Sequence, residues 1–146
     1  MYVAPLYRPP SEANSLILQI TIGCSHNQCT FCSMYKTKKY RVKSLEEIKQ
    51  HIQWGKSLYP HARRIFLADG NVLSMPTQDL IQVLQILFEE FPYLERVTAY
   101  AGPKDLLEKS SEELALIRRA GLSMLYLGIE SGSAQVLANI KKGVSP

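Results

Sequence analysis

Short apolar runs alternate along the chain with stretches in which apolar residues recur every three or four positions. The runs predict strands and the periodic stretches predict amphipathic helices. Strands alternating with helices are typical of βα units around a parallel sheet. We therefore expect an α/β fold with four such units, whose strands cover residues 16–23, 65–68, 96–100 and 123–129.

Each predicted strand is followed by a helix with its own start signal. Two helices begin with a capping box, in which a serine and a glutamate three residues later bond each other's backbone. The other two begin at a proline, which suits a first helical turn, and at a capping serine. In chain order these signals are Ser44 with Glu47, Pro76, Ser110 with Glu113, and Ser133.

The helical periodicity also predicts which side chains face the core, and glycines are expected to end the last two helices. The expected inward set is Leu45, Ile48, Ile52, Leu80, Leu84, Leu87, Phe88, Phe91, Leu114, Ile117, Val136, Leu137 and Ile140, and the expected glycines are Gly121 and Gly143.

Parallel crossovers are overwhelmingly right-handed, so the four units should wind one way into a curved sheet with the helices outside. All strand C-termini then face one rim, where ligands of parallel α/β folds bind. The polar segments GCSHNQC, ADGN, AYAGPK and GIESGS all fall there. The sequence therefore predicts a ligand site at this rim.

All three cysteines of the chain, Cys24, Cys29 and Cys32, lie within nine residues of one another. An odd, crowded set with no secretory signal argues against a disulfide framework. Three close thiolates suit an iron–sulfur cluster with one iron left open. A structural zinc site needs four ligands, and only His26 is near enough to be the fourth, so we favour the cluster over zinc.

Composition narrows the class of protein further. The chain is 46% hydrophobic and 21% charged, as is ordinary for a globular domain, and its net charge of +4 suits an anionic cofactor or substrate. No apolar run reaches membrane-spanning length and no signal peptide is evident, so we expect a cytoplasmic protein without a membrane partner. The basic loop at residues 36–43 leaves RNA open as a partner, although a solvated loop is favoured.

The segment GCSHNQCTFC after the first strand, with Phe31 before the last cysteine, resembles the cluster motif of the radical S-adenosylmethionine (SAM) superfamily. Four residues separate Cys24 from Cys29, where the common pattern has three. The resemblance extends over YRPPSEA, MYKTKKYRVKS and GIESGSAQVLANIKKG. It is strongest to bacterial members without an assigned substrate, and more distant to the Elp3, methylthiotransferase and anaerobic coproporphyrinogen oxidase groups.

This resemblance implies an enzyme in which Cys24, Cys29 and Cys32 bind a [4Fe–4S] cluster. The methionyl group of SAM would chelate the open iron, and an electron would cleave SAM to a 5′-deoxyadenosyl radical that takes hydrogen from substrate. An electron donor such as flavodoxin or ferredoxin is therefore an implied partner. The substrate cannot be predicted.

The resemblance also implies the residues that contact SAM. The turn after the second strand replaces the superfamily's Gly-Gly-Glu type of turn, which meets the SAM amino group. The carboxylate after the fourth strand corresponds to a group on the ribose hydroxyls, and a later lysine to one on the SAM carboxylate. The implied contacts are Phe31, Asp69, Gly70, Asn71, Glu130, Ser131 and Lys142.

Each of these residues also has a plainer interpretation. Asp69, Gly70 and Asn71 are common in turns without any ligand. Glu130 and Lys142 could be solvated charges at helix ends. Only their joint placement at one rim favours a binding site.

Superfamily cores of this type are partial TIM-type barrels of six βα units. The resemblance therefore implies about four of these units here, with an N-terminal extension at residues 1–15 and an incomplete core domain at 16–146. The fourth strand would then be an unpaired edge, and the isolated chain should bind SAM weakly. Two alternatives stay open: a non-catalytic zinc-binding module, and a half-domain that acts only with a separate C-terminal partner.

Overall fold

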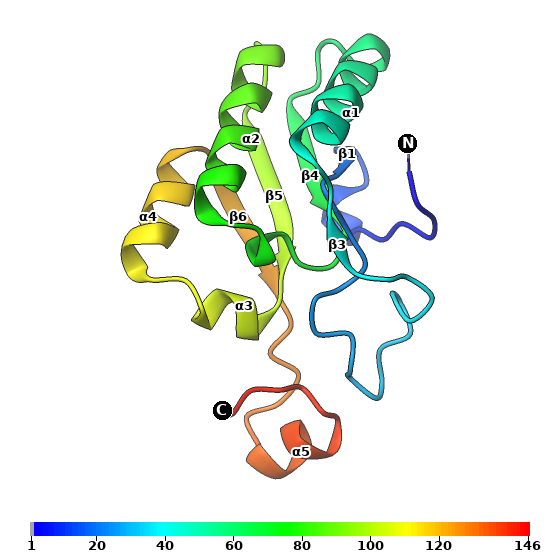
Figure 1. Ribbon diagram of the computed structural model, residues 1–146, viewed down its shortest axis with the longest axis vertical. Helices are drawn as coiled ribbons and strands as arrows, with labels where there is room; N and C mark the ends of the chain where they lie inside the picture. The colour runs from blue at the N-terminus through cyan, green and yellow to red at the C-terminus, as the bar shows by residue number, and fades with distance from the viewer. Residues whose placement is uncertain (1) are drawn as a thin grey trace.

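The structure is a computed structural model that describes residues 2–146. Its centre is a four-stranded sheet in which every pairing is parallel, in the order β1-β4-β5-β6. Three helices cover one face of this sheet (Figure 1). The predicted α/β fold, with its curved parallel sheet and outer helices, is confirmed. The strands are β1 (Leu16–Gln19), β4 (Arg64–Ala68), β5 (Arg96–Ala101) and β6 (Leu122–Leu127).

The start signals of the helices are largely confirmed. Both predicted capping boxes are present, and Ser133 caps the last helix. The second helix begins directly after Pro76, with that proline as its cap residue. The four helices are α1 (Leu45–Leu58), α2 (Thr77–Glu90), α4 (Ser111–Arg119) and α5 (Ala134–Asn139).

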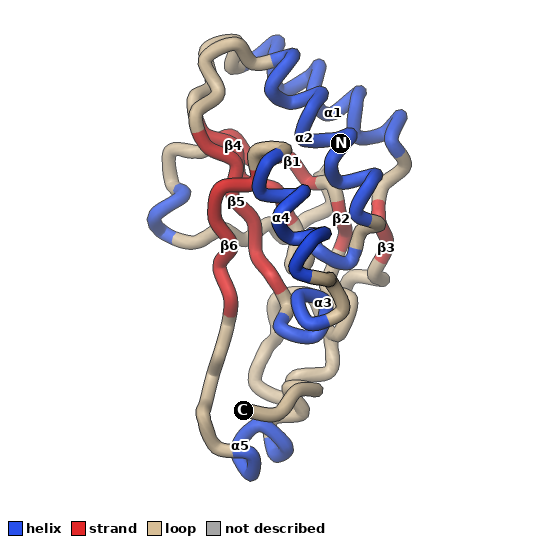
Figure 2. The backbone as a smooth tube through the Cα atoms, turned by 90° about the vertical axis from the view of Figure 1, so that its left-hand side faces the viewer, coloured by secondary structure: helices blue, strands red, loops and turns tan. Residues whose placement is uncertain are grey.

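Three short elements carry no periodic signal and were not predicted. They are η1 (Pro10–Glu12), η2 (Val72–Ser74) and α3 (Pro103–Leu107), each a turn or so long. Figure 2 shows that α5 lies beyond the C-terminal end of the sheet, joined to β6 by an extended segment. The helix of the last βα unit therefore does not pack against the sheet as the helices of the first three units do.

The predicted first strand is wrong in its second half. It ends at Gln19, and the chain continues as β2 (Thr21–Ile22), which pairs antiparallel with β3 (Arg41–Val42) in a separate two-stranded sheet. Between the two, the Ile20 amide donates to Ala68 of β4 (2.7 Å), while the Ile20 carbonyl accepts from Lys43 (3.0 Å). This pairing closes the base of the loop that carries the cysteines.

Several expectations for side chains also need correction. Phe88, expected inward, is 38% exposed because it lies at the end of α2 against Gly121. Val136 is 42% exposed, whereas its neighbour Leu137 is buried. Gly121 follows α4 with a φ of +117°, which confirms the predicted helix end.

The apolar core lies between the sheet and the three helices that cover it. It joins the outward-facing strand residues to the inner stripes of α1, α2 and α4. Leu18, Ile52, Ile65, Leu84 and Leu87 are fully buried there.

The opposite face of the sheet carries a separate aromatic cluster. The ring of Phe66 lies 5.1 Å from that of Tyr100 and 6.3 Å from that of Tyr126. Beside this cluster, the buried Glu12 carboxylate accepts hydrogen bonds from Arg96 (2.9 Å) and from Tyr126 (2.6 Å). Burial alone would raise the pKa of Glu12, but hydrogen bonds to its carboxylate, first from Ser15 and then from Tyr126, together with the charge of Arg96, outweigh it and the pKa is lowered. The N-terminal segment is thereby held against the inner face.

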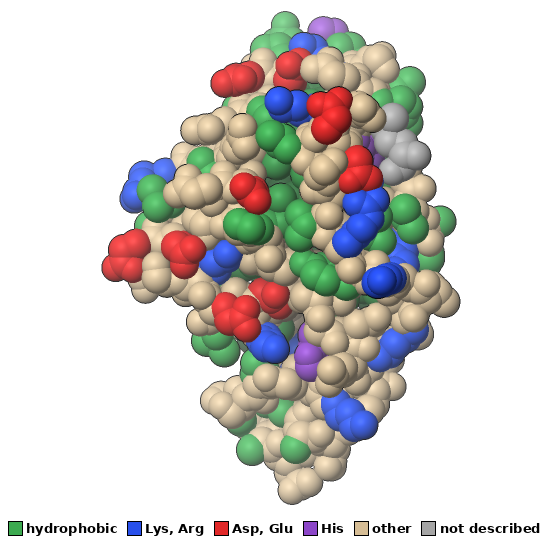
Figure 3. Space-filling model, viewed as in Figure 1, with side chains coloured by type: hydrophobic (Ala, Val, Ile, Leu, Met, Phe, Trp, Pro, Cys, Tyr) green, Lys and Arg blue, Asp and Glu red, His purple; other side chains and the backbone are tan. Residues whose placement is uncertain are grey.

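Figure 3 shows acidic and basic side chains interspersed over the face formed by the helices. Among residues 2–146, no helix is both long and apolar enough to span a bilayer.

His51 on α1 gives the fold a pH dependence. Its side chain is 1% exposed, and burial, aided by the charge of Lys43, lowers its pKa to about 4. In the unfolded chain His51 is protonated as the pH falls below about 6.5, whereas in the folded chain it stays neutral until about pH 4. We expect the free energy of unfolding to fall by on the order of 3 kcal/mol between pH 7 and pH 4 from this group alone.

Urea unfolding across this pH range measures the effect. His51→Leu should flatten the pH dependence, whereas His61→Gln, at an exposed position, should leave it intact. The same slope in the wild type and His51→Leu would contradict the prediction.

Candidate functional site

The loops that follow the parallel strands meet at one end of the sheet, as predicted. Figure 1 shows the cysteine-bearing loop and α5 at this same end. Two backbone bonds of the turn after β4 join it to the cysteine-bearing loop: the Asp69 amide donates to Thr21 (3.2 Å) and the Gly70 amide to Gly23 (3.1 Å). The rim is thus one connected structure.

Cys24, Cys29 and Cys32 are free thiols, and all three are half-buried. Burial is the main reason that the pKa of the Cys29 thiol is raised. The Lys142 ammonium opposes this rise, while Cys24 and Cys32 add to it. The pKa of Cys29 thus depends on its burial, on Lys142 and on the two other cysteines.

No three His, Cys, Asp or Glu side chains among residues 2–146 are gathered in a way that could hold a single metal ion. An iron–sulfur cluster needs a different arrangement of ligands, because each thiolate binds a different iron atom. Three unpaired, half-buried thiols on one loop fit that donor set. The cysteines thus suit a cluster by their chemistry.

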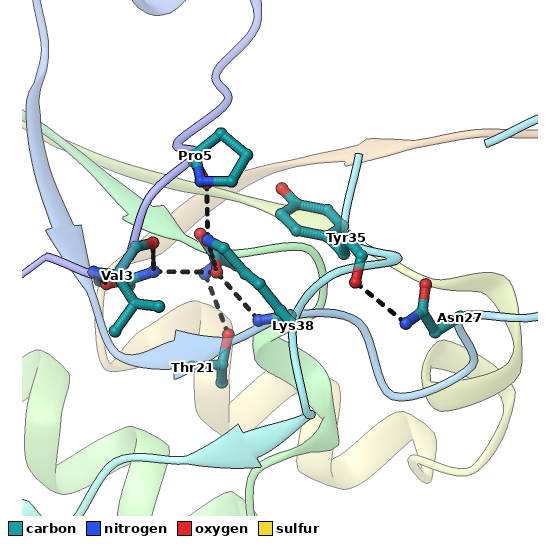
Figure 4. Close-up of polar contacts among 9 residues, drawn as sticks. Val3, Pro5, Thr21, Asn27, Tyr35 and Lys38 are labelled. Carbon is teal, nitrogen blue, oxygen red and sulfur yellow. Dashed lines mark hydrogen bonds and ion pairs between the residues drawn. The ribbon is translucent and has the colours of Figure 1, made fainter. Parts of the chain in front are cut away.

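Asp69 is the fully buried centre of the polar contacts beneath the cysteine loop. Its Oδ2 atom accepts from Lys38 Nζ (2.7 Å), from Gln19 Nε2 (2.9 Å) and from the backbone amide of Gly23 (2.9 Å) (Figure 4). Its other oxygen, Oδ1, has no hydrogen-bond partner among the described residues. One carboxylate therefore joins β1, β4 and the cysteine loop.

The partners of Asp69 also hold the N-terminal segment. Lys38 Nζ donates to the Pro5 carbonyl (2.6 Å). The Gln19 side chain accepts from the Val3 amide (2.8 Å) and donates to the Val3 carbonyl (3.1 Å). Residues 2–5 consequently lie over the buried ion pair.

The interpretation of residues 36–43 as a solvated loop is wrong for Lys38 and Lys43, which are each only 6% exposed. The burial of Lys38 could not be predicted from the sequence, because its partner, Asp69, is 31 residues away. A lysine inside a basic run carries no local signal of burial.

Asn71 is also buried, and its side chain bonds protein groups on both sides. Its amide donates to Ser25 Oγ (2.7 Å) and to the Asp105 carboxylate, and its oxygen accepts from the Gly102 amide (3.1 Å). Ser25 in turn donates to Asp105 (3.0 Å). Asn71 thereby ties the cysteine loop to the end of β5 and to α3, two partners that the sequence did not reveal.

Gly70, between these two residues, lies against the cysteine loop. A Cβ atom at this position would be 2.6 Å from Cε2 of Tyr35 and 3.3 Å from Cβ of Cys24. Only a glycine leaves room for this approach. Gly70 is therefore required by packing, whatever ligand it meets.

The second group of predicted SAM contacts lies around Lys142. Its ammonium forms an ion pair with Glu130 (3.0 Å) and lies 6.0 Å from the centre of the Phe31 ring. Lys142 is 9% exposed, whereas Phe31 is 54% exposed. Ser131 has a different role, since its hydroxyl accepts from the Ser133 amide at the start of α5 (3.1 Å).

The segment after α5 is fastened to the cysteine loop. The Thr30 amide donates to the Ile140 carbonyl (3.0 Å), and His26 Nε2 bonds the Lys141 carbonyl (2.7 Å). Gly143 leaves space for the His26 ring, because a Cβ there would lie 2.7 Å from it. This contact brings Lys142 next to the cysteines.

Comparison with known proteins agrees with this geometry. The family model of the radical SAM superfamily matches residues 18–146. The chain therefore belongs to the radical SAM superfamily, whose members are expected to be enzymes that use a [4Fe–4S] cluster and SAM.

One curated relative is similar over most of this chain. It is the 4′-phospho-dehydrooxetanocin synthase of Priestia megaterium, 27% identical over 151 residues. The match covers 90% of this chain but 20% of the relative, so the chain spans about a fifth of the relative's length.

The tight packing at Gly70 can be tested directly. Its φ is not in the left-handed region, so Gly70→Ala adds a steric conflict with the buried Tyr35 ring and no backbone strain. We expect a loss of about 1–3 kcal/mol in the free energy of unfolding, as for other overpacked sites. Gly132→Ala is the matched control, because nothing lies within 4 Å of a Cβ there. Equal unfolding midpoints for the two variants in urea would refute the packing argument.

Proposed function

We propose that this chain binds the [4Fe–4S] cluster and SAM of a radical SAM enzyme, with Cys24, Cys29 and Cys32 as the cluster ligands. The observation that carries the proposal is three free, half-buried thiols on one anchored loop at the rim of a parallel sheet. When bound, the cluster supplies the electron that cleaves SAM to the 5′-deoxyadenosyl radical. Membership of the superfamily disfavours a zinc-binding module.

The residues around the cysteines suit the charges of SAM. The Lys142 ammonium, beside Cys29 and Phe31, can hold the SAM carboxylate, and Glu130 can accept from the ribose hydroxyls. Asp69 is fully buried, so on this proposal it supports the SAM site from beneath by holding the Gly23 amide and Lys38. The backbones of Gly70 and Asn71 would line this end of the site, because the space beside Gly70 is filled by Tyr35 and the Asn71 side chain is engaged by Ser25 and Asp105. Ser131 would lie at its edge, where its hydroxyl accepts from the Ser133 amide.

We further propose that the whole protein contains more than these four βα units. The outer strand β6 has one unpaired edge, and its Met124 and Leu127 side chains are each 39% exposed. A further strand pairing there would cover them. On this proposal residues 16–146 belong to the core domain and residues 1–15 form an N-terminal extension, whose described part contacts the core through Val3, Pro5 and Glu12. A small electron-transfer protein such as flavodoxin or ferredoxin would supply the electron, and the substrate class stays open.

The cluster ligands are tested by reconstitution with iron and sulfide in the absence of oxygen. The wild type should take up iron and show the broad visible absorption of a cluster, and Cys24→Ala, Cys29→Ala and Cys32→Ala should each lose most of both. Ser33→Ala, an exposed position on the same loop, is the control and should match the wild type. A Cys29→Ala variant that keeps a full cluster, or a wild type that takes up only zinc, would overturn the assignment.

The role of Glu130 is tested by binding. Glu130→Gln removes one charge at constant shape, so the iron content should be unchanged while the affinity for SAM falls roughly tenfold or more, as for a lost bond to a charged group. Equilibrium dialysis with SAM on the reconstituted protein measures this. Glu89→Gln, exposed on α2, should bind SAM as the wild type does. Equal affinity of Glu130→Gln and the wild type would remove Glu130 from the site.

A further inference from the structure

A hollow of about 700 Å³ lies at the opposite end of the sheet from the cysteines. It is found where β1 and β4 begin and where α1 ends, and residues of the N-terminal segment complete its wall. Figure 1 shows the connection from α1 to β4 at the top of the molecule, far from α5 and the cysteine loop. Small-molecule sites usually measure about 300–1,000 Å³. This hollow is therefore large enough for a ligand, and the proposed SAM site makes no use of it.

The wall of this hollow is basic. Arg8, Arg63 and Arg64 line it, and none of the described Asp or Glu residues does. Glu95, outside the wall, forms an ion pair with Arg63 and also acts on Arg64, but one carboxylate leaves two of the three positive charges unbalanced. One nitrogen of Arg8 donates to the Ser15 carbonyl (3.0 Å), which holds that guanidinium at the wall. The hollow therefore attracts an anion.

Aromatic rings form another part of the wall. The rings of Tyr2 and Trp54 meet edge to face, 5.3 Å apart between centroids, and the Tyr2 hydroxyl donates to the Ile17 carbonyl (2.6 Å). Tyr59, the residue after α1, lines the same hollow and is 57% exposed. An exposed aromatic ring is a surface on which a planar base can stack. The wall thus combines guanidinium groups with stacking surfaces.

We propose that this hollow is a second binding site, which takes a free nucleotide. The base would stack on the aromatic part of the wall, and the phosphates would bind Arg8 and Arg64, because guanidinium groups match phosphate oxygens with paired hydrogen bonds. Inorganic phosphate would leave the rings uncovered, and a neutral aromatic molecule would leave the positive charges unbalanced. SAM does not fit either, since it has no phosphate and carries a positive sulfonium. The inference goes beyond the proposed function, because the hollow contains none of the cysteines or proposed SAM contacts.

Trp54 makes the site directly measurable, because it is the only tryptophan of the chain and lies in the wall. ADP titrated into the full chain without cluster should quench the Trp54 fluorescence saturably, with excitation at a wavelength that adenine does not absorb. Adenosine, which lacks the phosphates, should bind about tenfold more weakly or worse. Excess SAM should not displace ADP.

Two variants separate the charge from the ring. Arg64→Gln should weaken ADP binding by about tenfold. Arg118→Gln, which removes an exposed arginine of α4 outside the hollow, is the matched control and should bind ADP as the wild type does. Tyr59→Ala should also weaken ADP binding by about tenfold, as for a lost stacking partner, but should leave the affinity for pyrophosphate, measured by calorimetry, unchanged.

The absence of saturable quenching by ADP overturns the proposal. Equal affinities for ADP and adenosine, or equal losses in Arg64→Gln and Arg118→Gln, also overturn it, because the arginines of the wall would then have no part in binding. Displacement of ADP by SAM would place ADP at the rim, and a short RNA that binds more tightly than ADP would identify a strand as the ligand; either result contradicts a free-nucleotide site. Because these assays need no cluster, their failure leaves the proposed function intact, and a failed reconstitution leaves this inference intact.

Discussion

The rim of this sheet depends on one buried carboxylate. Asp69 has no exposure to solvent, and a charge in that position is tolerated only with an opposite charge and further hydrogen bonds. Lys38, Gln19 and the Gly23 amide supply them from three different parts of the chain. Because removing either charge would leave the other buried and unpaired, these parts must fold together. The last residue of β1, the turn after β4 and the start of the cysteine loop are therefore fixed as one unit.

The same constraint explains why a loop of this length can carry ligands. The β2 and β3 pairing closes its base, Asp69 holds its first residue after β2, and the Ile140 and Lys141 carbonyls hold its far side. Loops usually provide mobile positions, but backbone bonds at both ends leave few ways for this one to move. The cysteines are thus placed by long-range contacts and not by the local sequence around them.

This dependence on distant contacts decides what could be predicted. Hydrophobic periodicity and capping signals are local, so the four βα units, both capping boxes and the rim position of the cysteines were predictable from residue patterns. The end of β1 at Gln19, the burial of Lys38 and the Asn71 to Asp105 contact were not, because each depends on a partner more than 30 residues away. Phe88 shows the same limit. It lies on the apolar stripe that the periodicity predicts, but its ring packs against Gly121 and stays partly exposed. The burial of Tyr35 could not be predicted either, because its ring packs against Tyr7 and Gly70, which lie far from it along the chain.

The anchors also bear on the energetics of the cysteines. The pKa of the Cys29 thiol is raised chiefly by burial and in lesser part by Cys24 and Cys32, whereas an iron–sulfur cluster would bind this sulfur as a thiolate. A free loop would relieve this repulsion by separating the sulfurs, and metal binding would then have to order the loop as well as deprotonate it. Asp69, the short β2 and β3 pairing and the contacts after α5 hold the loop that carries the sulfurs in place beforehand. The Lys142 ammonium lowers the pKa of Cys29 and so opposes the effect of burial, which suits the thiolate that the proposed cluster would need at this position.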